Sequence, residues 1–296
     1  MLVQTLVNGI SLGSTYALTA LGFALIYRTL GIFHFAHGSV YALSAHIAYS
    51  LITRWQLPLI LSLIFTIMAG ALVGILINFV IYEPMKKQNS SRQVFMIASI
   101  GTSIVIQNLI ASIWGAITKV LVVPDSETYL YKIYAVGPAF VTAAQLLVIL
   151  VTVIALIAIA VFSRSSVGLS IIALGNDAAV AENLGMNVKK IRYITLAVGS
   201  ALAALSALLV SLDLRAVDSA MGVPILLMTI ITVIVGGAGS FSAVIAGGYL
   251  VGLIKNFGIW AITAEWDNTL LFIVLVLVIM YKPQGLFGRR ISKLGR

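Results

Sequence analysis

Long apolar runs alternate with short polar segments along this chain. The runs lie at 1–27, 30–53, 57–82, 94–117, 141–162, 191–212, 225–235, 241–257 and 269–281. A helix of roughly 20 apolar residues crosses the hydrocarbon core of a bilayer, so most of these runs are long enough to span a membrane. The run at 225–235 is too short to cross alone. The pattern predicts an all-α, polytopic bundle of about eight or nine spans, with glycine-broken helices among them.

Polar segments between the runs divide the chain into parts. The segment at 118–140 alternates polar and apolar residues and contains Tyr and Pro, which predicts a small exposed hairpin. The longest interruption is the loop at 163–190. We therefore predict a single transmembrane domain, with a first half at 1–162, the loop at 163–190, a second half at 191–282 and a basic tail at 283–296.

The loop at 163–190 contains the start and stop signals of a short helix. Asn176 and Asp177 can accept hydrogen bonds from free N–H groups at a helix start, and Gly185 suits the left-handed residue that ends a helix. A capped helix between spans is suited to docking a soluble partner; the alternative is an ordinary connecting loop. The candidate coupling residues are Gly175, Asn176, Asp177, Ala178, Ala181, Glu182, Leu184 and Gly185.

Composition places most of the chain in lipid. Of the 296 residues, 61% are hydrophobic and only 9% are charged, with a mean hydropathy of +1.11. A soluble domain carries about 25% charged residues. The chain contains no cysteine, which excludes disulfides and thiolate metal sites. The first run lacks a charged start and a small-residue cleavage site, so we expect a span there rather than a removable signal peptide.

Positive charge is concentrated in four segments. Most of the 18 Lys and Arg lie at Arg28, at 83–93, at 164–192 and in the tail. If these segments share one side of the membrane, that side is cytoplasmic by the positive-inside rule, and so is the tail. The net charge of +9 then reports topology and contact with anionic lipids, not a nucleic-acid surface.

Two apolar stretches, 31–51 and 235–253, resemble each other. When Gly38-Ser39 is aligned with Gly239-Ser240, both stretches place a Gly/Ser break before a helix of small residues. Paired broken helices often line the substrate path in the two halves of a transporter, which predicts a path here and a possible internal two-half repeat. Close helix packing through small residues is the alternative.

His34 and His37 lie three residues apart beside the first predicted break. A metal needs more ligands than this pair offers, so we predict no metal site. We expect each imidazole to donate to a backbone carbonyl freed by the break; contact with substrate is the alternative. Polar residues inside spans are candidates for function, or they tie helices together. The path candidates are Asn8, Tyr16, His34, His37, Gly38, Ser39, Gly236, Gly237, Gly239 and Ser240.

Signatures of ATP binding and metalloprotease chemistry are absent from the sequence. There is no GxxxxGK[ST] phosphate loop and no HExxH zinc motif, so we expect no enzyme and no ATP site in this chain. The acidic residues lie in loops, which disfavours a proton relay of buried carboxylates.

Several stretches resemble the LivH-type permeases, the membrane subunits of ATP-driven importers for branched-chain amino acids. NGISLGSTYALTALGFALIYRTLGIFHFAHGSVYALSA at 8–45 resembles their opening signature. The tract at 168–192 is similar to their cytoplasmic loop, and 221–254 and KPQGLFG at 282–288 match their last third. Phe33-His34 departs from the family pattern, which is nearer to GIxNFAHG, so the polarity beside the path is expected to differ.

The resemblance implies a bacterial or archaeal inner-membrane permease that works with partners. An extracytoplasmic binding protein would deliver substrate, and this chain would pair with a second, related permease. Two ATPase subunits would hydrolyse ATP and push on the short helix, so this chain itself would bind no cofactor. Relatives for urea and short amides share these motifs. A self-sufficient channel for a small neutral solute and a membrane-embedded enzyme are the other readings.

Overall fold

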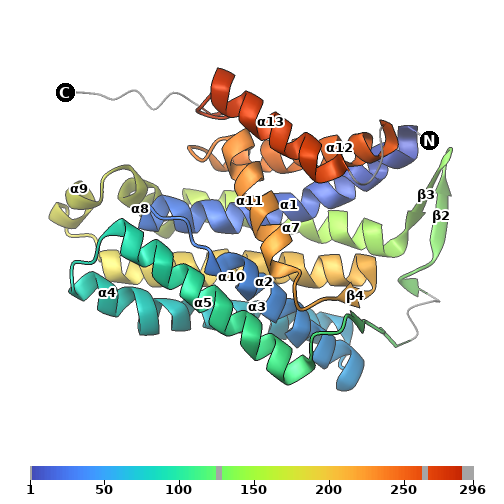
Figure 1. The fold of residues 1–296 in the computed structure, drawn as a ribbon, viewed down its shortest axis with the longest axis horizontal. Helices are drawn as coiled ribbons and strands as arrows, with labels where there is room; N and C mark the ends of the chain where they lie inside the picture. Colours follow the sequence, from blue (N-terminus) through green and yellow to red (C-terminus); the bar gives the residue numbers. More distant parts are fainter. Residues whose placement is uncertain (1, 125–128, 262–265, 289–296) are drawn as a thin grey trace.

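The computed structural model describes residues 2–124, 129–261 and 266–288. Most helices run along one common direction, as Figure 1 shows. The α-helices are α1 (Leu2–Leu30), α2 (Ala36–Tyr49), α3 (Leu59–Ile77), α4 (Glu83–Lys87), α5 (Arg92–Trp114), α7 (Ala143–Arg164), α8 (Ser166–Asn176), α9 (Ala178–Asn183), α10 (Val188–Leu214), α11 (Gly222–Gly236), α12 (Phe241–Ala261) and α13 (Asp267–Tyr281). Two π-helical turns, η1 (Ser50–Arg54) and η2 (Asn78–Tyr82), extend α2 and α3.

The predicted polytopic helical bundle is confirmed. Among the described residues, six helical stretches are long and apolar enough to cross a membrane, and they include α1, α5, α7 and α10. Shorter apolar helices, α11 and α13 among them, complete the bundle. Together with α2, this agrees with the predicted number of spans.

The structure has interruptions that correspond to both predicted breaks, but the first is not where the sequence placed it. The second lies at 237–240, between α11 and α12, as predicted. The first lies at 31–35, whereas Gly38 and Ser39 sit inside the first turn of α2, so the predicted break at these two residues is wrong. Gly38 serves packing instead, because a Cβ there would lie 2.2 Å from the carbonyl oxygen of Gly222 on α11.

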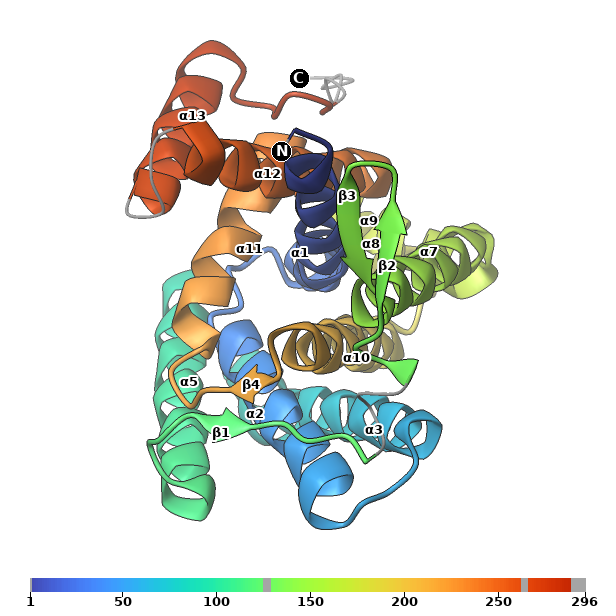
Figure 2. The ribbon, with the colours of Figure 1, turned by 90° about the vertical axis from the view of Figure 1, so that its right-hand side faces the viewer.

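The two longest helices, α1 and α10, form the centre of the bundle and run in opposite directions. α1 begins beside β3, where Gln4 donates to the carbonyl oxygen of Phe140, and it ends beside Asn176. α10 begins just after α9 and ends beside β1, where Leu121 donates to Arg215. α12 and α11 pack on α1, while α3 and α2 pack on α10 (Figure 2). The surroundings of α1 are thus repeated around α10.

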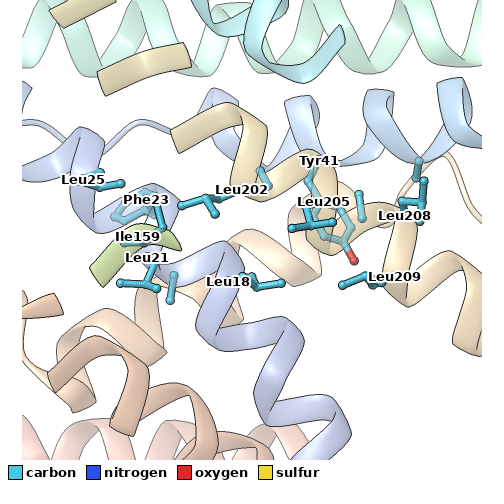
Figure 3. Packing of buried hydrophobic residues seen from close by; sticks show 14 of the residues in the cluster. Leu18, Leu21, Phe23, Leu25, Tyr41, Ile159, Leu202, Leu205, Leu208 and Leu209 are labelled. Atoms are coloured by element: carbon cyan, nitrogen blue, oxygen red, sulfur yellow. The ribbon is translucent and has the colours of Figure 1, made fainter. Parts of the chain in front are cut away.

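The main hydrophobic core fills the space between these helices. Figure 3 shows leucines of α1 and α10 interleaved, with Tyr41 of α2 and Ile159 of α7 beside them. The labelled core residues are Leu18, Leu21, Phe23, Leu25, Tyr41, Ile159, Leu202, Leu205, Leu208 and Leu209, all of which are buried.

Glycines four residues apart allow two pairs of helices to pack closely. On α12, a Cβ at Gly252 would lie 2.4 Å from the backbone N of Gly13 in α1, and Gly248 precedes it by one turn. On α3, Gly70 and Gly74 face α10 in the same way, and a Cβ at Gly74 would lie 2.4 Å from the Ser200 hydroxyl oxygen. Small residues at this spacing let helix backbones touch inside a membrane.

Short strands lie at the end of the bundle opposite α4, α8 and α9 (Figure 1). β2 (Ile133–Val136) and β3 (Ala139–Thr142) form an antiparallel hairpin, with Ile133 opposite Thr142. The predicted hairpin is therefore confirmed, although it lies at the end of the predicted segment 118–140 and its second strand continues past that segment to Thr142. β1 (Lys119–Val120) pairs with β4 (Ala216–Val217) and joins the chain before α7 to the end of α10.

Substituting Gly252→Ala is expected to lower stability, because the new methyl group must push α1 and α12 apart. Overpacking of this kind costs about 1–3 kcal/mol. Gly101→Ala in α5 is the matched control: a Cβ there has nothing within 4 Å, so stability should be unchanged or slightly higher. Thermal unfolding of the purified chain in detergent measures both. Equal midpoints for the two variants would contradict the close α1–α12 contact.

Candidate functional site

The loop that was predicted to hold one short helix contains two. α8 begins after Ser165, whose hydroxyl accepts from the N–H of Gly168 at 3.2 Å. Asp177 caps α9 as predicted, since its carboxylate accepts from the N–H of Val180 at 3.1 Å. The cap role predicted for Asn176 is wrong, because Asn176 is the last residue of α8 and its side chain accepts from Arg28 instead.

The end of α9 follows the sequence prediction. Gly185 has a φ of +77°, in the left-handed region. Its N–H donates to the carbonyl of Glu182, and the next N–H, of Met186, donates to that of Ala181. These two bonds form a Schellman motif, which satisfies carbonyls that a helix end leaves free. α9 is therefore capped at both ends and is suited to move as a unit.

α9 presents one face to the bundle and another outward. Ala181 is buried against the rest of the chain. Val180 and Leu184, four residues apart, are 52% and 74% exposed. Ala178 is the first residue of α9, and its side chain lies outside the described part. Two large apolar side chains exposed on one side of a protruding helix are suited to a groove in another protein.

Arg28, at the end of α1, joins this segment to the second helix break. One guanidinium nitrogen donates to the side-chain oxygen of Asn176 at 3.2 Å, and the other lies 3.4 Å from the carbonyl oxygen of Gly239. The guanidinium also lies over the ring of Phe241, 5.8 Å from its centre. Gly175 leaves room for this contact, because a Cβ there would lie 2.3 Å from Cγ of Arg28.

The segment 282–288, which we call the C-terminal strap, binds the end of α11. The N–H groups of Leu286 and Phe287 donate to the carbonyls of Val235 and Gly236 at 2.8 and 3.1 Å. Gly237 has a φ of +110° and lies against Gly285, so neither position has room for a side chain. The sequence did not predict this contact. Its only signal was an apolar GLFG inside a basic tail, and the rest of that tail, at 289–296, lies outside the described residues.

The two histidines beside the first break make different contacts. Nε2 of His37 donates to the carbonyl oxygen of Thr19 at 3.1 Å. A backbone carbonyl is the predicted type of partner, but this one belongs to the neighbouring helix α1 and not to the break. The prediction for His34 is wrong, because its Nδ1 is hydrogen-bonded to the hydroxyl of Tyr82 at 2.6 Å. Both imidazoles are fully buried, and His34 ties the break to η2.

The predicted path residues do not gather in one cavity within the described part of the chain. Asn8 accepts from the amides of Gln4 and Gln145, which ties α1 to α7. Tyr16 is buried in the apolar cluster between α1, α11 and α12. Gly239 and Ser240 line a hollow beside Arg28 and Phe241, whereas Ser39 lines a separate small hollow near Gln107. Gly236 and Gly237 face the C-terminal strap.

A short pattern in α1, Gly9-Ile10-Ser11-Leu12-Gly13, matches that of a hydrolase nucleophile. Such a serine needs a sharp strand-to-helix turn that exposes its hydroxyl. Here the pattern lies inside a continuous helix, and Ser11 is buried without a hydrogen-bond partner among the described residues. The local geometry therefore gives no nucleophile elbow.

Spanning helices around two broken ones, with a helical pair protruding at one end, form an arrangement that membrane transport proteins use. The chain matches the family described as "Branched-chain amino acid transport system / permease component" over residues 5–279, and it belongs to this family. The predicted resemblance to LivH-type permeases is thereby confirmed, and the chain is a multi-pass membrane protein.

Individual relatives cover nearly the whole chain. It is 29% identical to the high-affinity branched-chain amino acid transport system permease protein BraD of Pseudomonas aeruginosa, over 97% of this chain and 96% of the relative. The corresponding permease protein LivH of Escherichia coli is 28% identical, over 97% and 96%. The solved structure of PsaBC from Streptococcus pneumoniae in complex with Fab shares the fold, with a TM-score of 0.53, 17% identity, and coverage of 96% and 92%.

Removing the hydroxyl of Tyr82 is expected to destabilise the protein. Tyr82→Phe takes away the 2.6 Å partner of Nδ1 of His34 and leaves it only the hydroxyl of Ser99 at 3.5 Å among the described residues, which costs about 1–3 kcal/mol. Tyr41→Phe is the matched control, because the hydroxyl of Tyr41 is buried but has no partner among the described residues. Thermal unfolding in detergent should show a lower midpoint for the first variant only. A loss of similar size in both would argue against a specific bond between Tyr82 and His34.

Proposed function

We propose that this chain is a permease subunit of an ATP-binding-cassette importer for branched-chain amino acids. Membership of the permease family over residues 5–279 supports this function, as do the names of relatives that match the chain along nearly its full length. The observation that carries the proposal in the structure is α9, a capped helix that projects from the bundle with Val180 and Leu184 exposed. A channel that works alone has no use for such a helix.

The partners follow from this assignment. The chain pairs with a second permease, related but different, and the two form the path between them. Two ATPase subunits dock on α9 and hydrolyse ATP, so the chain itself binds no cofactor. An extracytoplasmic binding protein delivers substrate to the opposite face. Within the chain, the matching surroundings of α1 and α10 support two related halves in opposite orientations.

The α8–α9 end faces the cytoplasm in this proposal. Arg28, Lys86, Arg92 and Arg192 lie around one cavity at that end, so segments that are far apart in sequence bring their positive charge to the same side. The positive-inside rule then makes this the inner side. The N-terminus and the β2–β3 hairpin lie on the outer side, and the tail that follows α13 lies on the inner side.

The contacts of Arg28 define how movement of α9 reaches the path. When the ATPase subunits close on ATP, they displace α9 and, through its packed neighbour α8, Asn176. Arg28 bonds both Asn176 and Gly239, so the displacement is passed to the break between α11 and α12. The C-terminal strap holds the end of α11, which leaves the start of α12 as the part that moves.

The relatives' names favour an amino acid over urea or a short amide as the substrate. The departure of Phe33-His34 from the family pattern does not argue for a different substrate, because His34 is fully buried against Tyr82. A zwitterion with an apolar side chain suits the scarcity of charged residues in the spans.

Reconstitution tests the proposed function. Proteoliposomes that contain this chain, its partner permease and the ATPase subunits should take up radiolabelled leucine only when ATP and the binding protein are present. An excess of urea or acetamide should not compete with leucine. This chain alone in liposomes should pass no solute at a useful rate. Rapid uptake without nucleotide would support the channel reading and end the importer proposal.

Removing the apolar face of α9 is expected to uncouple the transporter. The double variant Val180→Ser, Leu184→Ser takes away two side chains that are exposed in this chain and would be buried by the ATPase. Burial of each contributes about 1.5–3 kcal/mol, so subunit association and uptake should fall at least roughly tenfold. Leu184→Met, which keeps an apolar side chain, is the control and should stay near wild type. Wild-type uptake by the double variant would rule out α9 as the docking element.

A further inference from the structure

A large cavity at the α8–α9 end carries a concentration of positive charge, and apart from the contacts of Arg28 the proposed function uses this charge only to assign the inner side. Its volume is about 640 Å³, and it lies between the ends of α1 and α8, the helix α4, and the starts of α5 and α10. Four cations line it: Arg28, Lys86, Arg92 and Arg192. Asp177 is the one carboxylate among the lining residues, and it caps α9.

No salt bridge joins a cation of the cavity to an acid within the described part of the chain, although Glu182 attracts Lys86 and Arg192 at longer range. Both ion pairs found there go to Glu83, from Lys87 and Lys189, and neither involves a cation that lines the cavity. The guanidinium of Arg28 donates to neutral oxygens only. Nε of Arg192 is buried without a hydrogen-bond partner. Four converging cations with one carboxylate favour an anion, and phosphate oxygens suit them.

The remaining lining combines polar residues such as Asn89 and Ser90 with an apolar part, and this apolar part narrows the class of anion. Leu30, Ile32 and Phe95 line it alongside the cations. Just beyond Phe95, the outer face of α5 exposes Val94 and Ile97, the latter to 67%. A phosphate head placed among the cations would therefore have an apolar surface beside it for hydrocarbon chains. A free phosphate ion would gain nothing from that surface.

We propose that this cavity binds the phosphate headgroup of an anionic phospholipid, with its acyl chains along α5. The inner leaflet supplies such lipids, and basic pockets between helices on that side are suited to hold them. The site does not depend on the substrate of the transporter or on its ATPase partners. A bound lipid would join α5 and α10 to the end of α8.

Binding of defined lipids by the purified full chain tests this site. Short-chain phosphatidylglycerol should raise the unfolding temperature in neutral detergent, whereas phosphatidylcholine of the same acyl length should not. The double variant Lys86→Gln, Arg92→Gln should bind phosphatidylglycerol about 25-fold more weakly, at roughly fivefold for each charge removed near the membrane surface. Lys87→Gln is the matched control: it lies on the same short helix, its side chain is 77% exposed and it does not line the cavity.

Several results would overturn the proposal. One is equal binding of phosphatidylglycerol and phosphatidylcholine by the wild-type chain. A second is unchanged phosphatidylglycerol affinity in the double variant, or an equal loss in Lys87→Gln. A third is an equal rise in unfolding temperature with inorganic phosphate alone, which would make this a site for free anions. If the double variant does not fold, native mass spectrometry of the wild-type chain with both lipids decides: preferential retention of phosphatidylglycerol supports the site, and no preference refutes it.

Discussion

A backbone group that a broken helix exposes inside a bilayer must find its partner within the protein, because no water is there to take that role. This constraint explains what surrounds both breaks. At the first, the N–H of Ala36, which opens α2, donates to the hydroxyl of Ser99 on α5. At the second, the last carbonyls of α11 accept from Leu286 and Phe287 of the C-terminal strap. Each break therefore depends on a segment far away in the chain.

Close backbone contact between helices is the second organising feature, and two helix pairs achieve it with glycines at the same spacing. Gly248 and Gly252 let α12 lie directly on α1, and Gly70 and Gly74 let α3 lie directly on α10. Because α1 and α10 run in opposite directions, the two arrangements also run in opposite directions through the bundle. Hydrophobic burial holds helices together weakly in lipid, so contacts of this kind carry much of the packing.

Local signals predicted the spans, the caps of α9 and the hairpin, because each depends on neighbouring residues such as Asp177 and Gly185. Pairings between distant residues were beyond the sequence. Nothing near His34 indicates Tyr82, and nothing near the end of α11 indicates the strap. The break assigned to Gly38 failed for a related reason: a glycine that frees the backbone and a glycine that makes room for Gly222 look the same in one sequence.

The C-terminal strap also sets an order of assembly during synthesis. α11 is made before α12 and α13, whereas the N–H groups that complete its end come after both helices. Until then, the carbonyls of Val235 and Gly236 have no strap to accept from. α11 therefore reaches its final position only after two further helices have entered the membrane. A chain released early would retain most of its spans and still leave this segment unfinished, open to proteolysis by quality control.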